Sequence, residues 1–98
     1  MWLLKTAEDA DPPFTFRILP GSIKTIGRAA RADFIVDAPL VSRVHCRLTA
    51  GADALELKDL DSTNGTFVNG TRVDSARLSP GDHLQVGRVE LVALRDAE

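Results

Sequence analysis

Residues 55–70 read LELKDLDSTNGTFVNG, and this stretch combines two patterns that indicate the type of fold. In Leu55–Lys58 apolar and charged side chains alternate, which is the period-two pattern of a strand with one buried face. Two Asn-Gly dipeptides follow, at 64–65 and 69–70, and this dipeptide supplies the positive φ angles of tight hairpin turns. The stretch therefore predicts short antiparallel strands.

The same alternation continues outward in both directions. It occurs in Phe14–Ile18, around Cys46 and Leu48, and in the pairs Leu84/Val86 and Val89/Leu91. Pro20-Gly21 and Pro80-Gly81 add further turn signals. No stretch has the i, i+3, i+4, i+7 stripe of an amphipathic helix, and 52–60, the best helical rival, favours a strand through its alternating leucines. These observations predict an all-β chain, built as an antiparallel sandwich or barrel.

Two segments lie outside the strand pattern. Residues 7–13 are polar and contain two prolines, so we expect them to form the loop between the first two strands. Residues 95–98 are expected to be a tail, or the point at which a longer protein was cut. Because no repeat, low-complexity tract or linker interrupts the sequence, we expect residues 1–98 to form a single domain.

Length and composition limit the classes of protein that this sequence can belong to. The 98 residues are 44% hydrophobic and 27% charged, which is the balance of one globular domain with a modest core. The apolar runs are too short to span a membrane, and Met1–Lys5 lacks the features of a secretory signal. The single cysteine excludes an internal disulfide and indicates a reducing compartment. We therefore expect an intracellular, cytoplasmic protein, with the nucleus as the alternative.

The distribution of charge favours a small anion over a nucleic acid as the partner. Twelve basic and fourteen acidic residues give a formal net charge of −2, whereas nucleic-acid binders are usually basic. Four arginines are nevertheless concentrated within residues 28–47: Arg28, Arg31, Arg43 and Arg47. The sequence thus allows a local anion site on an acidic protein.

Three polar clusters lie in the expected loops or strand ends. They are Ile26–Arg28, Val41–His45 and Asp61–Thr66, the last followed by Asn69-Gly70. Arginine offers a planar fork of donors matched to phosphate oxygens, and serine and threonine add short neutral donors. Asparagine can both donate to and accept from a peptide backbone. These residue types suit a phosphate pocket, but by themselves they suit ordinary turn chemistry equally well.

The histidine allows two other interpretations. A catalytic site would pair His45 with Ser42 as base and nucleophile, with Asp33 or Asp37 orienting the ring. A metal site would join three residues: His45, Cys46 and His83. Neither arrangement has a recognisable ligand spacing or a general-acid partner. We therefore expect no enzyme, no metal centre and no cofactor.

Taken in order, the clusters closely resemble the forkhead-associated (FHA) family of phosphothreonine-binding domains. The family pattern is Gly-Arg, then Ser-Arg-x-His, then Ser-Thr-Asn-Gly-Thr and a later Asn-Gly. All of these motifs are present, at 27–28, 42–45, 62–66 and 69–70. The resemblance covers essentially the whole chain and implies an antiparallel β-sandwich of about eleven short strands, with ligand-gripping loops at one end.

The resemblance also implies a role for each position. Five residues would bind the phosphopeptide: Arg28, Ser42, Arg43, Thr63 and Asn64, the last as a clamp on the peptide backbone just past the phosphothreonine. Five others would support the site: Gly27, His45, Gly65, Asn69 and Gly70. Cys46 is expected to face the core as an inert packing residue.

The implied function is that of a non-enzymatic module that docks phosphothreonine-containing segments of partner proteins in signalling. A separate Ser/Thr kinase would mark the partner, because the sequence contains no nucleotide-binding loop or catalytic carboxylate signature. The alternative is a scaffold of the same fold that docks or dimerises independently of phosphate. Neither a nucleic acid nor a membrane is expected as a partner, and the oligomeric state is left open.

Overall fold

The computed structural model describes residues 1–7 and 13–96, and these residues form eleven strands and no helix. The strands are β1 (Trp2–Thr6), β2 (Thr15–Ile18), β3 (Ile23–Gly27), β4 (Phe34–Ile35), β5 (Cys46–Ala50), β6 (Leu55–Asp59), β7 (Thr66–Val68), β8 (Thr71–Val73), β9 (Ser75–Leu78), β10 (His83–Val86) and β11 (Val89–Arg95). Within this described part of the chain there is accordingly no helix of the length and apolarity that crossing a membrane requires.

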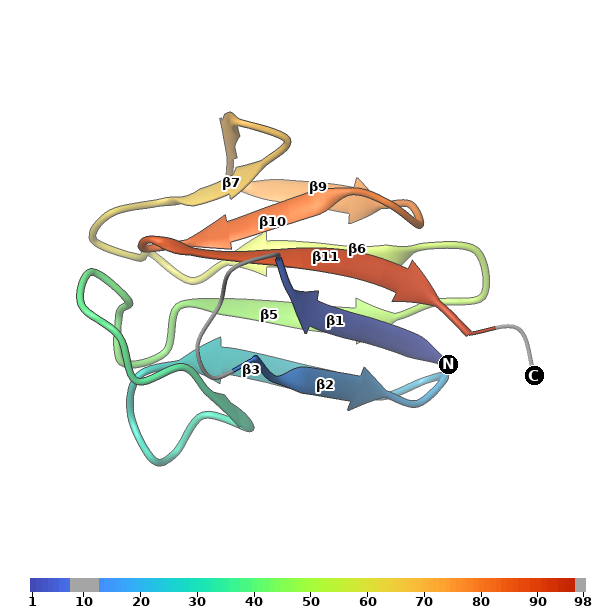
Figure 1. Ribbon diagram of the computed structural model, residues 1–98, viewed down its shortest axis with the longest axis horizontal. Coiled ribbons are helices and arrows are strands. Elements are labelled where there is room, and N and C mark those ends of the chain that lie inside the picture. The colour runs from blue at the N-terminus through green and yellow to red at the C-terminus, as the bar shows by residue number, and fades with distance from the viewer. Residues whose placement is uncertain (8–12, 97–98) are drawn as a thin grey trace.

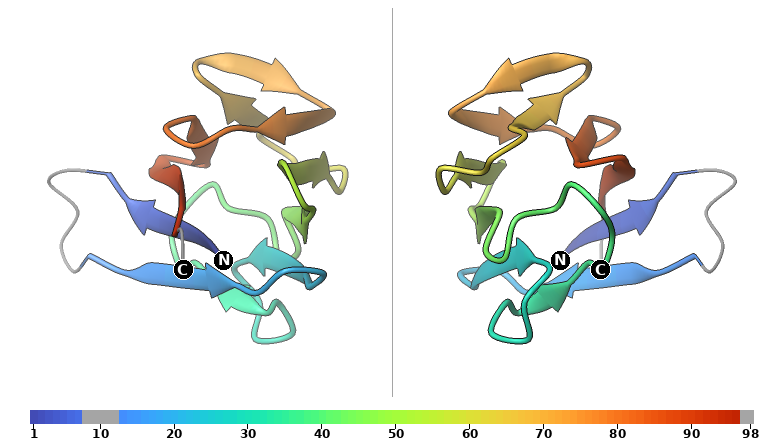
Figure 2. Two further views of the ribbon diagram at one scale, coloured as in Figure 1. Left: turned by 90° about the vertical axis from the view of Figure 1, so that its right-hand side faces the viewer. Right: turned by 90° about the vertical axis from the view of Figure 1, so that its left-hand side faces the viewer.

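The strands form two sheets that pack face to face (Figures 1 and 2). One sheet has the order β2-β1-β11-β10-β7-β8 and the other has the order β4-β3-β5-β6-β9. The predicted antiparallel β-sandwich is confirmed, with one difference: the two-residue strand β4 pairs parallel to β3. The short loop between β3 and β4 therefore turns back, so that β4 lies alongside the end of β3 at the edge of the five-stranded sheet.

The core lies between the sheets and follows the alternation in the sequence. Leu55 and Leu57 of β6 are buried, whereas the charged residues between and after them, Glu56 and Lys58, are exposed. Cys46 is fully buried, as expected. Each leucine buried in this way contributes about 1.5–3 kcal/mol to stability. The two-layer core therefore provides a rigid base for the loops.

The turns show which Asn-Gly signal closes a hairpin. Asn69 and Gly70 both have positive φ, 50° and 85°, and connect β7 directly to β8, as a type I′ turn requires. Of the earlier pair only Gly65 has positive φ, 89°, and its loop carries the chain from one sheet to the other. The first Asn-Gly is therefore a crossover loop, not a tight hairpin.

The two chain ends lie at one end of the sandwich, and one set of connecting loops lies at the opposite end (Figure 1). Arg95, placed in a tail by the sequence, is the last residue of β11 and pairs with Trp2 of β1. The loop expected over 7–13 falls mainly on 8–12, which lie outside the described residues, as do 97 and 98. At the far end the loops after β3, β4, β6 and β10 gather together (Figure 2, right).

Candidate functional site

A groove opens among the loops at this end. It is lined by Arg28 and Arg31 from the β3–β4 loop, by residues 37–44 from the segment before β5, and by four residues of the β6–β7 loop: Leu60, Asp61, Thr63 and Asn64. All five residues that the sequence predicted to bind the ligand line the groove. Its charged lining consists of three arginines and two aspartates, Asp37 and Asp61.

Arg28 stands at the end of β3 with part of its guanidinium free. The backbone N–H of Arg28 donates to the Ser42 carbonyl (2.9 Å), and its Nε donates to the Val41 carbonyl (3.1 Å). The two terminal nitrogens make no hydrogen bond to any residue that the structure describes. Their N–H donors are therefore available to an anion in the groove.

Ser42 and Thr63 join the two loops that flank the groove. The backbone N–H of Thr63 donates to Oγ of Ser42 at 3.0 Å. A serine hydroxyl that accepts one hydrogen bond still has its own proton to donate. Ser42 is half-buried and Thr63 is exposed, so the serine hydroxyl lies in the wall of the groove with a donor to spare.

His45 is fully buried behind the groove and joins the same two loops. The backbone N–H of Ser42 donates to Nδ1 at 3.0 Å, which requires that Nδ1 carry no proton. The neutral ring then has its proton on Nε2, which donates to the Gly65 carbonyl at 2.9 Å. Both ring nitrogens are occupied, and the ring contacts Ser42 through its backbone and not its hydroxyl. This geometry opposes both the catalytic and the metal interpretation of His45.

The third residue of the metal interpretation is also misplaced. His83 is exposed on β10 and pairs with Glu90, whereas His45 and Cys46 are buried. Burial raises the pKa of the Cys46 thiol far above its ordinary value, and the nearby Asp59 carboxylate adds to this rise. Among residues 1–7 and 13–96 no group of three potential ligands is suited to hold a metal ion.

Asp59 holds the β6–β7 loop in shape from the end of β6. Its carboxylate accepts hydrogen bonds from the Ser62 hydroxyl (2.5 Å), the Thr66 hydroxyl (2.7 Å) and the Ser62 backbone N–H (3.2 Å). Burial alone would raise the pKa of Asp59, but these three hydrogen bonds outweigh it and the pKa falls below its ordinary value. The ionised carboxylate is thus the form that organises the loop.

Two glycines allow the close packing of these loops. A Cβ on Gly27 would lie 2.1 Å from the Arg43 carbonyl oxygen, so only glycine lets β3 approach the segment that carries Ser42. At Gly65 the φ of 89° disfavours other residues, and a Cβ would also meet the Arg72 side chain at 2.7 Å from Nε. Both glycines belong to the set that the sequence predicted as support.

Asn64 is exposed in the groove and is attached to the opposite loop. Its Nδ2 donates to the Leu40 carbonyl at 3.0 Å. This bond uses one of the two amide protons and leaves Oδ1 free to accept. Leu40 itself has a φ of 72°, and the neighbouring lining residue Asp61 has a φ of 56°.

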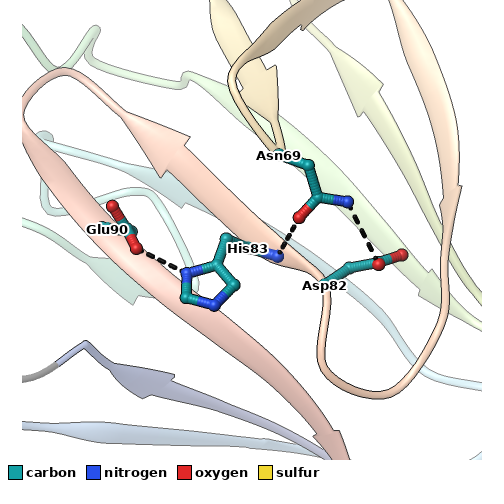
Figure 3. Close-up of polar contacts among 4 residues, drawn as sticks. All are labelled: Asn69, Asp82, His83 and Glu90. Carbon is teal, nitrogen blue, oxygen red and sulfur yellow. Dashed lines mark hydrogen bonds and ion pairs between the residues drawn. The ribbon is translucent and has the colours of Figure 1, made fainter.

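Asn69 and Gly70 lie outside the groove, although the sequence grouped them with it. Asn69 connects the β7–β8 turn to the start of β10: its Oδ1 accepts from the His83 N–H at 2.9 Å, and its Nδ2 donates to Asp82 at 3.2 Å (Figure 3). Its backbone N–H also donates to the His83 carbonyl. Asn69 therefore ties the β7–β8 turn to β10 within the six-stranded sheet, and neither Asn69 nor Gly70 is part of the groove lining.

Sequence reasoning missed several residues of the groove lining. Arg31 was noticed only as one of the clustered arginines, and Asp61 only as the first residue of a motif. Leu40 carried no signal at all, because a leucine with positive φ cannot be recognised from residue type.

Comparison with known proteins agrees with the fold. The FHA domain family model matches residues 24–87. The chain is 42% identical, over 78 residues, to the ABC transporter ATP-binding/permease protein Rv1747 of Mycobacterium tuberculosis, and this match covers 80% of the chain and 9% of the transporter. The chain also spans about half (48%) of the glycogen accumulation regulator GarA of the same species, at 38% identity over 79% of the chain.

Solved structures agree over nearly the whole chain. The FHA domain of protein CT664 from Chlamydia trachomatis superimposes with a TM-score of 0.91 at 25% identity, covering 98% of both chains. A structure from a study of phosphothreonine-dependent FHA domain interactions superimposes with a TM-score of 0.84 at 29% identity, covering 99% of this chain and 98% of that one. The fold is that of the FHA domains, which are phosphothreonine-binding interaction modules. The chain belongs to the FHA domain family.

Proposed function

We propose that this chain binds phosphothreonine-containing segments of partner proteins in the groove lined by Arg28, Ser42, Arg43, Thr63 and Asn64. The observation that carries the proposal is the arrangement of Arg28 and Ser42. Arg28 is held by its Nε on the Val41 carbonyl with its terminal N–H groups free, and the Ser42 hydroxyl is held by the Thr63 N–H in the lining of the same groove. Donors are thus fixed in place before the ligand arrives.

The chemistry of the groove suits a phosphate dianion. The phosphate of phosphothreonine carries about −1.5 to −2 charge and three acceptor oxygens at neutral pH. Each charge-assisted hydrogen bond contributes about 1.5–3 kcal/mol net. Part of this gain is offset by the ordering of a flexible peptide, so the complex has moderate affinity and is reversible. Asn64 clamps the peptide backbone just past the phosphothreonine through its free Oδ1.

The proposal includes the origin of the ligand and the cellular setting. A separate Ser/Thr kinase phosphorylates the partner, and this chain is not itself an enzyme. Nucleic acid is not a partner, because a net charge of −2 and a groove whose lining includes two aspartates do not suit a polyanion. The protein acts inside the cell, in the cytoplasm or alternatively the nucleus, in keeping with its single buried cysteine. Fractionation of cells that express the natural full-length protein tests this location.

A titration with matched peptides tests the function. The probe is a degenerate peptide mixture with one fixed phosphothreonine, and its control is the same mixture with threonine. We expect binding of the phosphorylated mixture only. Arg28→Ala should abolish this binding and change the thermal melt only slightly, since an exposed loop arginine adds nothing to the core and loses one side-chain hydrogen bond, to the Val41 carbonyl. Arg17→Ala removes an exposed arginine of β2 outside the groove and should change neither.

The opposite outcomes are equally clear. Equal binding of both mixtures would favour the phosphate-independent scaffold. Near-normal affinity of the Arg28→Ala variant would show that Arg28 does not bind the phosphate.

A further inference from the structure

Three consecutive residues before β5 hold most of the proposed binding set in place. The Leu40 carbonyl accepts the hydrogen bond from Asn64 Nδ2 at 3.0 Å, and the Val41 carbonyl accepts the bond from Arg28 Nε at 3.1 Å. Ser42, the next residue, carries the hydroxyl in the groove wall. Because Arg28 follows β3 and Asn64 follows β6, this short backbone joins binding residues from two separate loops. A shift of the backbone would therefore displace all three binding side chains together.

This backbone needs support from outside its own segment. Residues 36–45 form neither helix nor strand. Leu40 has a φ of 72°, which is unfavourable for a bulky residue, and its side chain is 46% exposed. Leu40 is therefore not fixed by burial. Strained backbone of this kind persists only where its surroundings enforce it.

The two-residue turn between β10 and β11 provides this support. It consists of residues 87–88 and lies among the loops at the groove end of the sandwich (Figure 1). A Cβ on Gly87 would lie 3.0 Å from the Pro39 carbonyl oxygen and from a Val41 methyl carbon, and 3.1 Å from the Leu40 carbonyl carbon. The turn therefore packs directly against the backbone of this segment.

The turn itself is anchored in the six-stranded sheet. Val86 and Val89 pair across it at the end of the β10–β11 ladder, and Val86 is fully buried. Nε2 of Gln85 also donates to the Gly87 carbonyl at 3.1 Å. Neither Gln85 nor Gly87 lines the groove. A bulkier turn would therefore displace the segment before β5 and not the hairpin.

We propose that Gly87 and Gln85 are positioning residues for phosphopeptide binding, which act through the backbone at 40–41. The inference rests on the proposed function and adds the element that fixes the spacing between Arg28 and Asn64. Binding groups must be held within about 0.5 Å of their productive positions, so the small shift forced by one extra carbon at position 87 is enough to weaken both contacts. Two residues outside the groove thus control the phosphate contact and the backbone clamp jointly.

Two glycine substitutions at opposite ends of β10 test the inference. Gly87→Ala forces the segment before β5 away, whereas Gly81→Ala in the β9–β10 turn meets nothing within 4 Å. Both glycines have positive φ, 59° and 94°, so both variants should melt at a lower temperature than the wild type. The probe is a single phosphothreonine peptide selected from the degenerate mixture. We expect Gly87→Ala to bind it at least about fivefold more weakly, the fold-change for losing one net hydrogen bond, and Gly81→Ala to bind it normally.

A double-mutant cycle shows whether the turn acts through the backbone at 40–41. Asn64→Ala removes the side chain that the Leu40 carbonyl holds. If Gly87 acts through that contact, Gly87→Ala should weaken binding less in the Asn64→Ala background than in the wild type. Gly81→Ala should have no effect on affinity in either background. Affinity losses of Gly87→Ala and Asn64→Ala that simply multiply would overturn the inference.

Gln85 supplies a second variant in case Gly87→Ala does not fold. Gln85→Met removes the donor to the Gly87 carbonyl and keeps a side chain of similar length. We expect weaker peptide binding, again with a smaller loss in the Asn64→Ala background. Normal affinity of the Gln85→Met variant would then overturn the inference.

The failure of this inference can be told from failure of the proposed function. If the wild type binds phosphothreonine peptides and requires Arg28, but folded Gly87→Ala and Gly81→Ala variants bind with equal affinity, only the positioning role is wrong. If the wild type ignores the phosphate, the proposed function itself is wrong and the positioning role falls with it.

Discussion

At the scale of single residues, the groove depends on a side chain that does not line it. His45 receives a hydrogen bond from the segment that carries Ser42 and donates one to the loop that carries Asn64. Because the ring is fully buried, each loop would have an unsatisfied backbone group without it. The segment that carries Ser42 and the loop that carries Asn64 are therefore coupled through one imidazole.

His45→Ala should lower both stability and affinity. A buried group left without its partner costs about 1–3 kcal/mol, so the free energy of unfolding should fall by at least that amount in a denaturant titration. Affinity for a phosphothreonine peptide should fall with it, because the two loops lose their fixed spacing. His83→Ala is the matched control. The His83 side chain is half-exposed and pairs with Glu90. We therefore expect its removal to change the free energy of unfolding by no more than about 1 kcal/mol and to leave peptide binding normal. A His45 variant as stable as the wild type would contradict this account.

At the scale of elements, the distance between β3 and the segment before β5 decides the width of the groove. The backbone N–H groups of Arg28 and Ala29 donate to the carbonyls of Ser42 and Arg43, which draws the two segments together. Gly27 lies directly against this segment, because a Cβ at position 27 would be 2.1 Å from the Arg43 carbonyl oxygen. A side chain at position 27 would therefore push Arg28 and Ser42 apart.

Two glycine substitutions separate this close contact from backbone conformation. Gly27→Ala introduces a Cβ that clashes with backbone, so we expect a strong loss of peptide affinity together with a stability loss of about 1–3 kcal/mol, the range for overpacking. Gly21→Ala has open space around its Cβ but a φ of 80°. We expect Gly21→Ala to lower the free energy of unfolding by about 1–2 kcal/mol and to leave peptide affinity unchanged. Calorimetric melts and titrations on both variants measure the difference, and equal affinities would show that the approach at Gly27 is unimportant.

The elements also show what could be predicted from residue pattern. The alternation in β6 and the paired turn residues at 69–70 are local properties, and they predicted the strands correctly. They left a sandwich or a barrel open, and the family resemblance indicated the sandwich. The parallel pairing of β4 depends on how a loop folds back, which no local pattern specifies. Family motifs led to all five predicted binding residues in the groove. Leu40 was missed because its φ is imposed by Asn64 and the β10–β11 turn, which are distant in sequence.

At the scale of the whole molecule, binding and folding should respond to acid in separate ranges. Hydrogen bonds lower the pKa of Asp59, despite its burial, and hydrogen bonds from Thr25 lower that of Asp33. A lowered folded-state pKa means that the stabilisation is present above the unfolded value of about 3.9 and is lost as the pH falls through the folded pKa. The ligand phosphate instead takes up its proton near pH 6.

We therefore expect peptide affinity to fall between pH 7 and pH 5 while the melting temperature changes little. Below about pH 4 the melting temperature should fall as well. Asp59→Asn should be less stable than the wild type at pH 7 and should lose less stability between pH 5 and pH 2, since one of the two carboxylates no longer titrates. Melting curves and titrations over this pH range provide the measurement. A loss of binding that coincided with unfolding would show that the phosphate charge is not what the groove recognises.

The pairing of β1 with β11 has a mechanical consequence. Trp2 lies opposite Arg95, and the Asp96 N–H donates to the Met1 carbonyl, so both ends of the described chain emerge side by side. Tension applied through the two ends would break the hydrogen bonds between β1 and β11 one after another, starting at Trp2 and Arg95, and not all at once. The loops that line the groove lie at the other end of the sandwich (Figure 1). A weak pull on the termini would therefore separate β1 from β11 before it disturbed a bound peptide.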